Sequence, residues 1–288
     1  MTELFIPSPS VGVWYLGPIP IRAYALSIIA GIVLGWWITA RRWRARGGTS
    51  ETLDGILVWA VLAGIIGARI YHVATDPELY FAPGRTWYRM FYIWEGGLGI
   101  WGAVAAGALA AWWRCRKAKV SFSALADVVA PGLLVAQAMG RVGNYFNQDL
   151  YGRPTTLPWG LEIDMAHRIS GYEQYATYQP TFLYELLWCL LGAGVLVVVE
   201  RLVPMGRGKL FAAYIVWYTL GRFWVEGLRI DTANRFDGLR LNSYTSLIVF
   251  AAGVVLLVYL FVTRPGHSPS PVEPPREPVI AADEADER

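Results

Sequence analysis

Residues Asn242–Val262 read NSYTSLIVFAAGVVLLVYLFV and contain no charged side chain. An α-helix rises about 1.5 Å per residue, so a helix of this length crosses the roughly 30 Å of hydrocarbon in a lipid bilayer. Ile21–Ala40 and Pro180–Val203 are similarly apolar. These three stretches predict helices that span a membrane.

The composition of the whole chain agrees with a membrane location. Of the 288 residues, 55% are hydrophobic and 16% are charged, whereas about 25% of the residues in a typical soluble domain are charged. The 14 Trp and 16 Tyr residues fit the aromatic belts found at membrane–water interfaces. The sequence therefore predicts an all-α polytopic membrane protein.

Four further apolar stretches bring the expected number of spans to seven: Leu53–Thr75, Gly96–Trp113, Phe122–Met139 and Leu210–Leu228. Met1–Pro20 lacks the basic start and apolar core of a cleavable signal peptide, so the first span is expected to be retained. The chain has no internal repeat of the kind that marks a transporter built from two related halves.

Three short loops are rich in basic residues: Arg41–Arg46, Arg114–Lys119 and Arg201–Lys209. The positive-inside rule places such loops in the cytoplasm. With seven spans, the N-terminus is then expected outside and the C-terminus inside.

Residues 1–264 are expected to form one membrane domain, with a small outer cap at about residues 144–179. Residues 265–288 are rich in Pro, Glu and Asp and contain no aromatic residue, so we expect a disordered cytoplasmic tail. Cys115 and Cys189 are expected to be unpaired thiols.

This topology gathers polar residues in the outer half of the bilayer. Arg222, Glu226 and Arg229 are spaced i, i+4, i+7 and share one helix face. A charge at the bilayer centre costs about 2.5–3.5 kcal/mol, so intramembrane charges are paired or functional. An interhelical ion pair would explain this triplet equally well, but Arg141 and Glu185 at a similar depth favour a functional site.

The most distinctive stretch, Gly140–Arg153, reads GRVGNYFNQDLYGR and is called the signature segment below. Arg141 lies between two glycines and presents a planar fork of five donors, the geometry that grips a phosphate. Asn144 and Asn147 add amide donors and acceptors. The segment predicts a binding site for an anionic head group.

The signature segment resembles that of the prolipoprotein diacylglyceryl transferase family, G-R-x-G-N-[FY]-x-N-x-E-x-x-G, from Gly140 to Gly152. Asp149 stands where the family usually has Glu, which keeps the charge and shortens the reach. Further similarities are Tyr24 near the start of the first span, Pro180–Glu185 (PTFLYE) and Arg222–Arg229 (RFWVEGLR). The resemblance extends from about Tyr24 to Val262.

The resemblance implies an enzyme that transfers the diacylglyceryl group of phosphatidylglycerol to the lipobox cysteine thiol of a preprolipoprotein and releases glycerol phosphate. It also implies a bacterial inner-membrane location with the site toward the outer leaflet. Phosphatidylglycerol, the preprolipoprotein signal peptide and membrane lipids are the expected partners, and no nucleic acid is expected. No cofactor or metal is expected, since the three histidines are scattered along the chain.

Within the implied site, we assign Arg141 and Arg222 as catalytic residues that stabilise charge on the phosphate and raise the thiolate fraction of the substrate. The remaining assignments concern substrate binding and positioning. Four residues of the signature segment would position the head group and the loop: Asn144, Asn147, Asp149 and Gly152. Glu226 and Arg229 would hold Arg222 in place. Tyr24 and Glu185 would complete the site.

One departure from the family concerns the proton acceptor. Many members have a histidine where this chain has Trp101, in the segment Trp94–Gly102 (WEGGLGIWG). His72 lies at a similar expected depth and is best interpreted as an interfacial histidine. Water, Asp149 or Glu226 would then accept the thiol proton. The alternative function is a non-enzymatic transporter or anionic-lipid-binding protein, which a transfer assay without any gradient would distinguish.

The expected orientation predicts a labelling pattern. Single cysteines placed near Gly47 and Gly206 should be shielded from an impermeant thiol reagent in intact cells, because both positions lie in basic loops. A cysteine placed near Gly171 should react. The reverse pattern would contradict the orientation and the convergence of polar residues on the outer side.

Overall fold

A computed structural model describes residues 5–233, 235–264 and 266. The described residues form seven long helices: α1 (Ala23–Ala45), α2 (Ser50–Thr75), α4 (Ile100–Lys117), α5 (Phe122–Asn147), α6 (Thr181–Leu202), α7 (Lys209–Leu228) and α8 (Leu241–Thr263). Short helical turns are α3 (Glu78–Phe81), η1 (Trp87–Phe91), η2 (Ile93–Glu95) and η3 (Met165–His167). The all-α membrane architecture is confirmed.

Strands occur only as antiparallel pairs of short segments in the described part of the chain. The pairs are β1 (Val13–Leu16) with β2 (Ile19–Arg22), β3 (Leu161–Glu162) with β4 (Thr177–Tyr178), and β5 (Arg235–Phe236) with β6 (Leu239–Arg240).

Each expected span coincides with one long helix. Five of them, α1, α2, α5, α6 and α8, are long and apolar enough by themselves to cross a membrane. Helices α4 and α7 do not reach that apolarity, so a total of seven spans and their orientation stay predictions. The expected tail lies outside the described residues except for Gly266.

Helix α5 is longer than the sequence indicated. It was expected to end at Met139 and instead continues to Asn147, so the first half of the signature segment is helical. Within this extension the Arg141 side chain donates to the Asn144 side chain at 3.0 Å. The expected site residues Arg141 and Asn144 therefore lie on the same helix.

The chain forms two compact units. One comprises the described residues within Met1–Arg42 and Ser123–Ser268, and the other comprises Trp43–Phe122. In the second unit, α2 and α4 pack through glycines. A Cβ atom at Gly67 would lie 2.5 Å from the Gly102 carbonyl oxygen, and one at Gly102 would lie 2.1 Å from that of Gly67. Small residues are typical of such close crossings of membrane helices.

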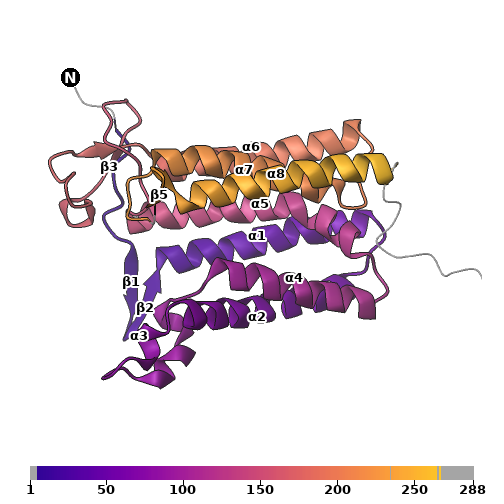
Figure 1. The fold of residues 1–288 in the computed structure, drawn as a ribbon, viewed down its shortest axis with the longest axis horizontal. Helices are drawn as coiled ribbons and strands as arrows, with labels where there is room; N and C mark the ends of the chain where they lie inside the picture. The colour runs from indigo at the N-terminus through magenta and orange to yellow at the C-terminus, as the bar shows by residue number, and fades with distance from the viewer. Residues whose placement is uncertain (1–4, 234, 265, 267–288) are drawn as a thin grey trace, which may run out of the picture. The chain divides into compact units, whose positions relative to one another are not determined.

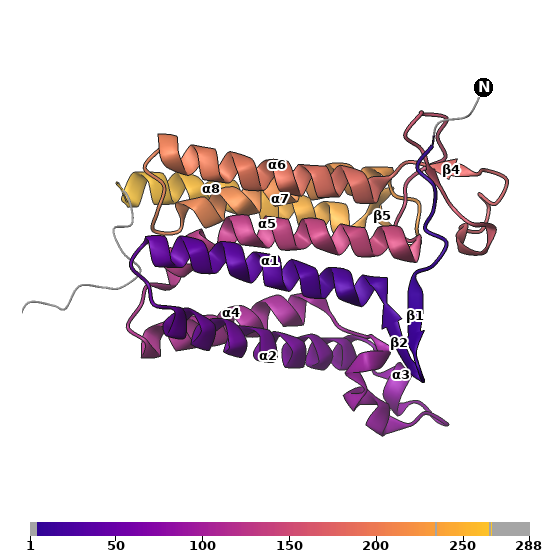
Figure 2. The same ribbon diagram turned by 180° about the vertical axis from the view of Figure 1, so that it is seen from behind.

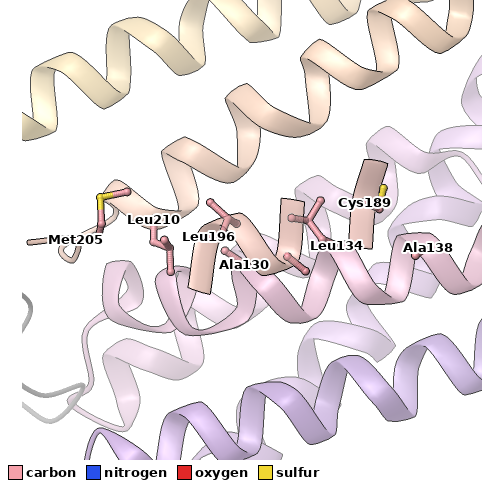
Figure 3. Close-up of a cluster of buried hydrophobic side chains, with 8 residues drawn as sticks. Ala130, Leu134, Ala138, Cys189, Leu196, Met205 and Leu210 are labelled. Carbon is pink, nitrogen blue, oxygen red and sulfur yellow. The ribbon is translucent and has the colours of Figure 1, made fainter. Parts of the chain in front are cut away.

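In the first unit, α5, α6, α7 and α8 run alongside one another (Figures 1 and 2). Figure 3 shows buried side chains that meet between α5, α6 and α7, among them Leu134, Cys189 and Leu210, all with zero exposure. This apolar core packs together α5, α6 and α7, which carry Arg141, Glu185 and Arg222.

A pair of tryptophans joins α6 to α7. The rings of Trp188 and Trp217 stack with centroids 4.5 Å apart. Each indole N–H donates to the backbone carbonyl of the other tryptophan, at 3.0 Å in both cases. Each ring also lies over a glycine of the facing helix: Trp217 over Gly192 and Trp188 over Gly221.

The expected cap is folded around its own small core. Strands β3 and β4 pair there, and buried Tyr151, Leu161, Ile163 and Tyr178 pack together. Burial raises the pKa of both tyrosines, whose hydroxyls donate to backbone carbonyls of His167 and Tyr172.

The tryptophan pair generates a stability prediction. Gly221→Ala should lower the free energy of unfolding by roughly 1–3 kcal/mol, because its Cβ would lie 2.1 Å from the Trp188 indole nitrogen. Gly194→Ala is the matched control, since no atom lies within 4 Å of a Cβ added there. Thermal unfolding of both variants in the same detergent measures the difference. Equal midpoints would contradict tight packing at Gly221.

Candidate active site

A buried carboxylate lies at the centre of the polar residues of the first unit. Glu226, near the end of α7, has a fully buried side chain. Its Oε2 atom is 2.6 Å from Nη2 of Arg222 and 3.5 Å from Nη1 of Arg229. Its Oε1 atom accepts hydrogen bonds from Arg240 at 2.6 Å and from Asn242 at 3.2 Å. Glu226 therefore fixes three arginines around one point.

Asp231 ties two of these arginines together. It accepts two hydrogen bonds of 2.8 Å from the fork of Arg229 and one of 2.9 Å from Arg240. Burial alone would raise the pKa of Asp231, but these hydrogen bonds and positive charges outweigh it and lower the pKa. Asp231 thus remains an anion at neutral pH.

A second carboxylate, Glu185 of α6, connects α5 to α7. Its Oε1 atom lies 3.5 Å from Nε of Arg141, and its Oε2 atom lies 3.3 Å from Nη1 of Arg222. These arginines and carboxylates form what we call the arginine cluster: Arg141, Arg222, Arg229, Arg240, Glu185, Glu226 and Asp231.

Two of the four arginines are more accessible than the others. The side chains of Arg141 and Arg222 are 22% and 19% exposed, against 7% for Arg229 and 6% for Arg240. Among the described residues, Nη2 of Arg141 and Nε of Arg222 have no hydrogen-bond partner. Arg141 and Arg222 therefore retain donors for a ligand, whereas the donors of Arg240 are used internally.

The signature segment orients Arg141. Its Nη1 atom donates to Asn144 at 3.0 Å, and the Asn144 amide donates to Asp149 at 2.7 Å. Asn147 donates to the other oxygen of Asp149 at 3.4 Å. Asp149, where the family usually has Glu, reaches both asparagines because the chain turns sharply after α5, with φ of 52° at Gln148.

Gly143 and Gly152 allow the signature segment to pack closely. A Cβ at Gly143 would lie 2.6 Å from the ring of Tyr24, so the expected site residue Tyr24 is beside α5. The Gly152 amide donates to the Gln179 carbonyl at 2.9 Å, and Gly152 pairs with Arg229 as an isolated β-bridge. The cap is thereby attached to the end of α7.

A narrow pocket, too tight in this conformation to hold a water molecule, lies beside the cluster. Its lining combines arginines and a carboxylate with apolar side chains: Arg141, Asn144, Leu150, Thr181, Phe182, Glu185, Val225 and Arg229.

The structure brings together most of the residues selected from the sequence. Three members of the network were missed: Asp231, Arg240 and Asn242. Asp231 follows Arg229 by two positions, and Arg240 directly precedes α8. A charge next to an apolar span is usually interpreted as interfacial, so sequence alone gave no reason to pair Arg240 with Glu226.

Trp101, His72 and Arg69 belong to the other compact unit. Trp101 lies in α4 and is half exposed, and Nδ1 of His72 is 3.1 Å from Asp76. Arg69 is buried and donates to backbone carbonyls, including that of Met90 at 2.6 Å. No group of three or more metal-binding side chains occurs among the described residues.

Comparison with known proteins identifies the family. The model of the prolipoprotein diacylglyceryl transferase family matches residues 12–259. A protein of Cutibacterium acnes named phosphatidylglycerol–prolipoprotein diacylglyceryl transferase is 55% identical over 260 residues, which are 90% of this chain and 88% of the relative. A protein of Streptomyces coelicolor with that name and the number 2 is 53% identical over 266 residues, 92% of this chain and 84% of the relative. The chain therefore belongs to the prolipoprotein diacylglyceryl transferase family.

Proposed function

We propose that this protein transfers the diacylglyceryl group of phosphatidylglycerol to the lipobox cysteine of a preprolipoprotein and releases glycerol phosphate. The observation that supports this most is the pair Arg141 and Arg222, joined through Glu185 and provided with unused donors. The names of relatives that match nearly the whole chain support the reaction itself.

The charge of the arginine cluster suits a phosphodiester. Four arginines contact three carboxylates, which leaves one net positive charge in a poorly hydrated site. Phosphatidylglycerol has one negative charge on its phosphate. Negative charge increases on the departing phosphate during transfer, and fixed guanidinium groups stabilise such charge more strongly where water is sparse.

We assign the roles within the site as follows. Arg141 and Arg222 bind the phosphate, and their potential favours the thiolate of the incoming cysteine. Asn144, Asn147, Asp149 and Gly152 position Arg141 and the cap, while Glu226 and Arg229 hold Arg222. Tyr24 packs beside the head group.

The proposed orientation in the membrane rests on the three basic loops. The protein would cross the bacterial inner membrane seven times, with the basic loops in the cytoplasm and the cluster toward the outer leaflet. Phosphatidylglycerol would enter from that leaflet. The lipobox of a preprolipoprotein signal peptide would reach the site from the same side of the membrane.

Arg141→Lys tests the phosphate assignment. Transfer to a lipobox peptide should fall roughly 30- to 1000-fold, because an ammonium group cannot replace a planar fork that donates to both Asn144 and a phosphate. Arg153→Lys, at an exposed position in the cap, is the matched control and should retain full activity. Comparable turnover of both variants at equal membrane abundance would remove Arg141 from this role.

The Trp101 position generates a second prediction. Trp101→Phe should retain substantial activity, because a tryptophan cannot accept the thiol proton and should only contact lipid. The wild-type pH profile should show no inflection near 6.5 of the kind that an essential histidine produces. An inflection there that disappears in His72→Gln would instead make His72 the base.

A further inference from the structure

The transfer needs an acceptor for the thiol proton. A cysteine thiol with a pKa near 8.5 is only a few per cent ionised at neutral pH. The chain has a tryptophan at position 101, so the acceptor must be sought among the groups that surround the phosphate site. Four carboxylates belong to the signature segment or the cluster: Asp149, Glu185, Glu226 and Asp231. Asp231 is excluded because both of its oxygens accept hydrogen bonds from Arg229, one of them also from Arg240, and it does not line the pocket.

Glu226 is fully committed to internal pairs. Both of its oxygens are within 2.6 Å of arginine nitrogens, its side chain is fully buried, and it does not line the pocket. Protonating it would leave Arg240 and Arg222 without their shared counter-ion. Glu226 is therefore a structural anion.

Asp149 is similarly occupied. One oxygen accepts from Asn144 and the other accepts from Asn147. Asp149 is also absent from the residues that line the pocket. Its charge is used to hold the two amides that orient Arg141.

Glu185 differs from both. It lines the pocket, whereas Glu226 does not. Oε1 of Glu185 and Oε2 of Glu226 both form no hydrogen bond with any described residue, but Oε2 of Glu226 is only 2.6 Å from Arg222, whereas Oε1 of Glu185 is 3.5 Å from Nε of Arg141. Its other charged or titratable neighbours are Arg222 and Tyr218 from α7 and Cys189 from its own helix. One carboxylate oxygen beside the phosphate-binding arginines thus lacks a close partner.

We propose that Glu185 is the general base that accepts the thiol proton, a role that rests on the proposed transfer reaction. The thiol proton moves to Oε1 of Glu185 while the sulfur forms a bond to the glycerol carbon that bears the phosphate. The bond from that carbon to the phosphate oxygen breaks, and both electrons go to the oxygen. Glycerol phosphate leaves as a dianion and the protein retains a neutral Glu185.

Charge balance supports this choice of base. Arg141, Arg222, Glu185 and the phosphodiester together carry no net charge before the reaction. Afterwards the phosphate has gained one negative charge and Glu185 has lost one, so the group is still neutral. A proton transfer to bulk water would leave one uncompensated negative charge in a poorly hydrated site, which is costly.

Lipid binding would also prepare the base. The contacts of Glu185 with its two arginines are 3.3 and 3.5 Å, longer than the 2.6 Å pairs of Glu226. A phosphate that takes donors from Arg141 and Arg222 weakens these long contacts first. Glu185 then becomes a better proton acceptor when phosphatidylglycerol is in place.

The test compares wild type with Glu185→Gln, which keeps the size of the side chain and removes its basicity. The assay measures transfer from phosphatidylglycerol vesicles to two lipobox peptides, one with cysteine and one with selenocysteine, whose selenol is already ionised at neutral pH. With the cysteine peptide at pH 7, kcat should fall about 100-fold or more. That deficit should shrink roughly tenfold per pH unit as the pH approaches the thiol pKa near 8.5.

The selenocysteine peptide separates a base from a positioning residue. Glu185→Gln should process it at nearly the wild-type rate, because no proton must be removed. Glu226→Gln is the comparison variant and should lose the same factor with both peptides and at every pH, because it disturbs Arg222. A deficit of Glu185→Gln that is likewise independent of pH and peptide would overturn the proposal.

Two controls keep the result decisive. If Glu185→Gln does not accumulate in membranes, Glu185→Ala with added formate replaces it; recovery of cysteine transfer supports the proposal, and no recovery in a folded protein contradicts it. Failure of wild type to modify either peptide would instead reject the proposed function. Wild-type transfer with an unaffected Glu185→Gln variant would reject only the role of Glu185.

Discussion

The ion pairs of Glu226 are the interaction on which the site depends. A carboxylate with no exposure is expensive to bury unless its charge is matched and its oxygens are hydrogen-bonded. Arg222, Arg229 and Arg240 meet both requirements. Because these arginines come from α7 and from the segment before α8, one buried anion determines how both helix ends and the intervening loop are arranged.

The four arginines of the cluster differ in how completely they are paired, which underlies the proposed division between structural and ligand-binding roles. Arg229 and Arg240 both pair with Asp231 as well as with Glu226. These ion pairs offset the cost of burying the two guanidinium groups. Among the described residues, the only carboxylate contact of Arg141 is the one of 3.5 Å with Glu185. Arg222 has a 3.3 Å contact with Glu185 and one close ion pair, with Glu226 at 2.6 Å. Paired charges reduce the cost of burying such a cluster in a low-dielectric environment. Guanidinium donors that are not used internally can bind a phosphate, whereas a fully paired cluster would have none to offer.

Much of this arrangement could be predicted from sequence because it follows from local spacing. The apolar stretches located every long helix, and the i, i+4, i+7 spacing of Arg222, Glu226 and Arg229 placed them on one face. The pairing of Glu226 with Arg240 could not be predicted, since it joins residues 14 positions apart across a turn. The length of α5 was also missed, because the apolar stretch ends at Met139 while the helix continues through polar residues to Asn147.

The same distinction explains why the proton acceptor could not be chosen from sequence. Asp149, Glu185 and Glu226 are equivalent as residue types, and depth in the membrane does not separate them. Their contacts do: amides hold Asp149, arginines at 2.6 Å hold both oxygens of Glu226, and the arginines nearest to Glu185 are 3.3 and 3.5 Å away. A base must have a free lone pair and must gain a proton without unbalancing its surroundings, and both conditions depend on tertiary contacts. If Glu185 accepts the proton as proposed, a histidine at position 101 is not required for the transfer.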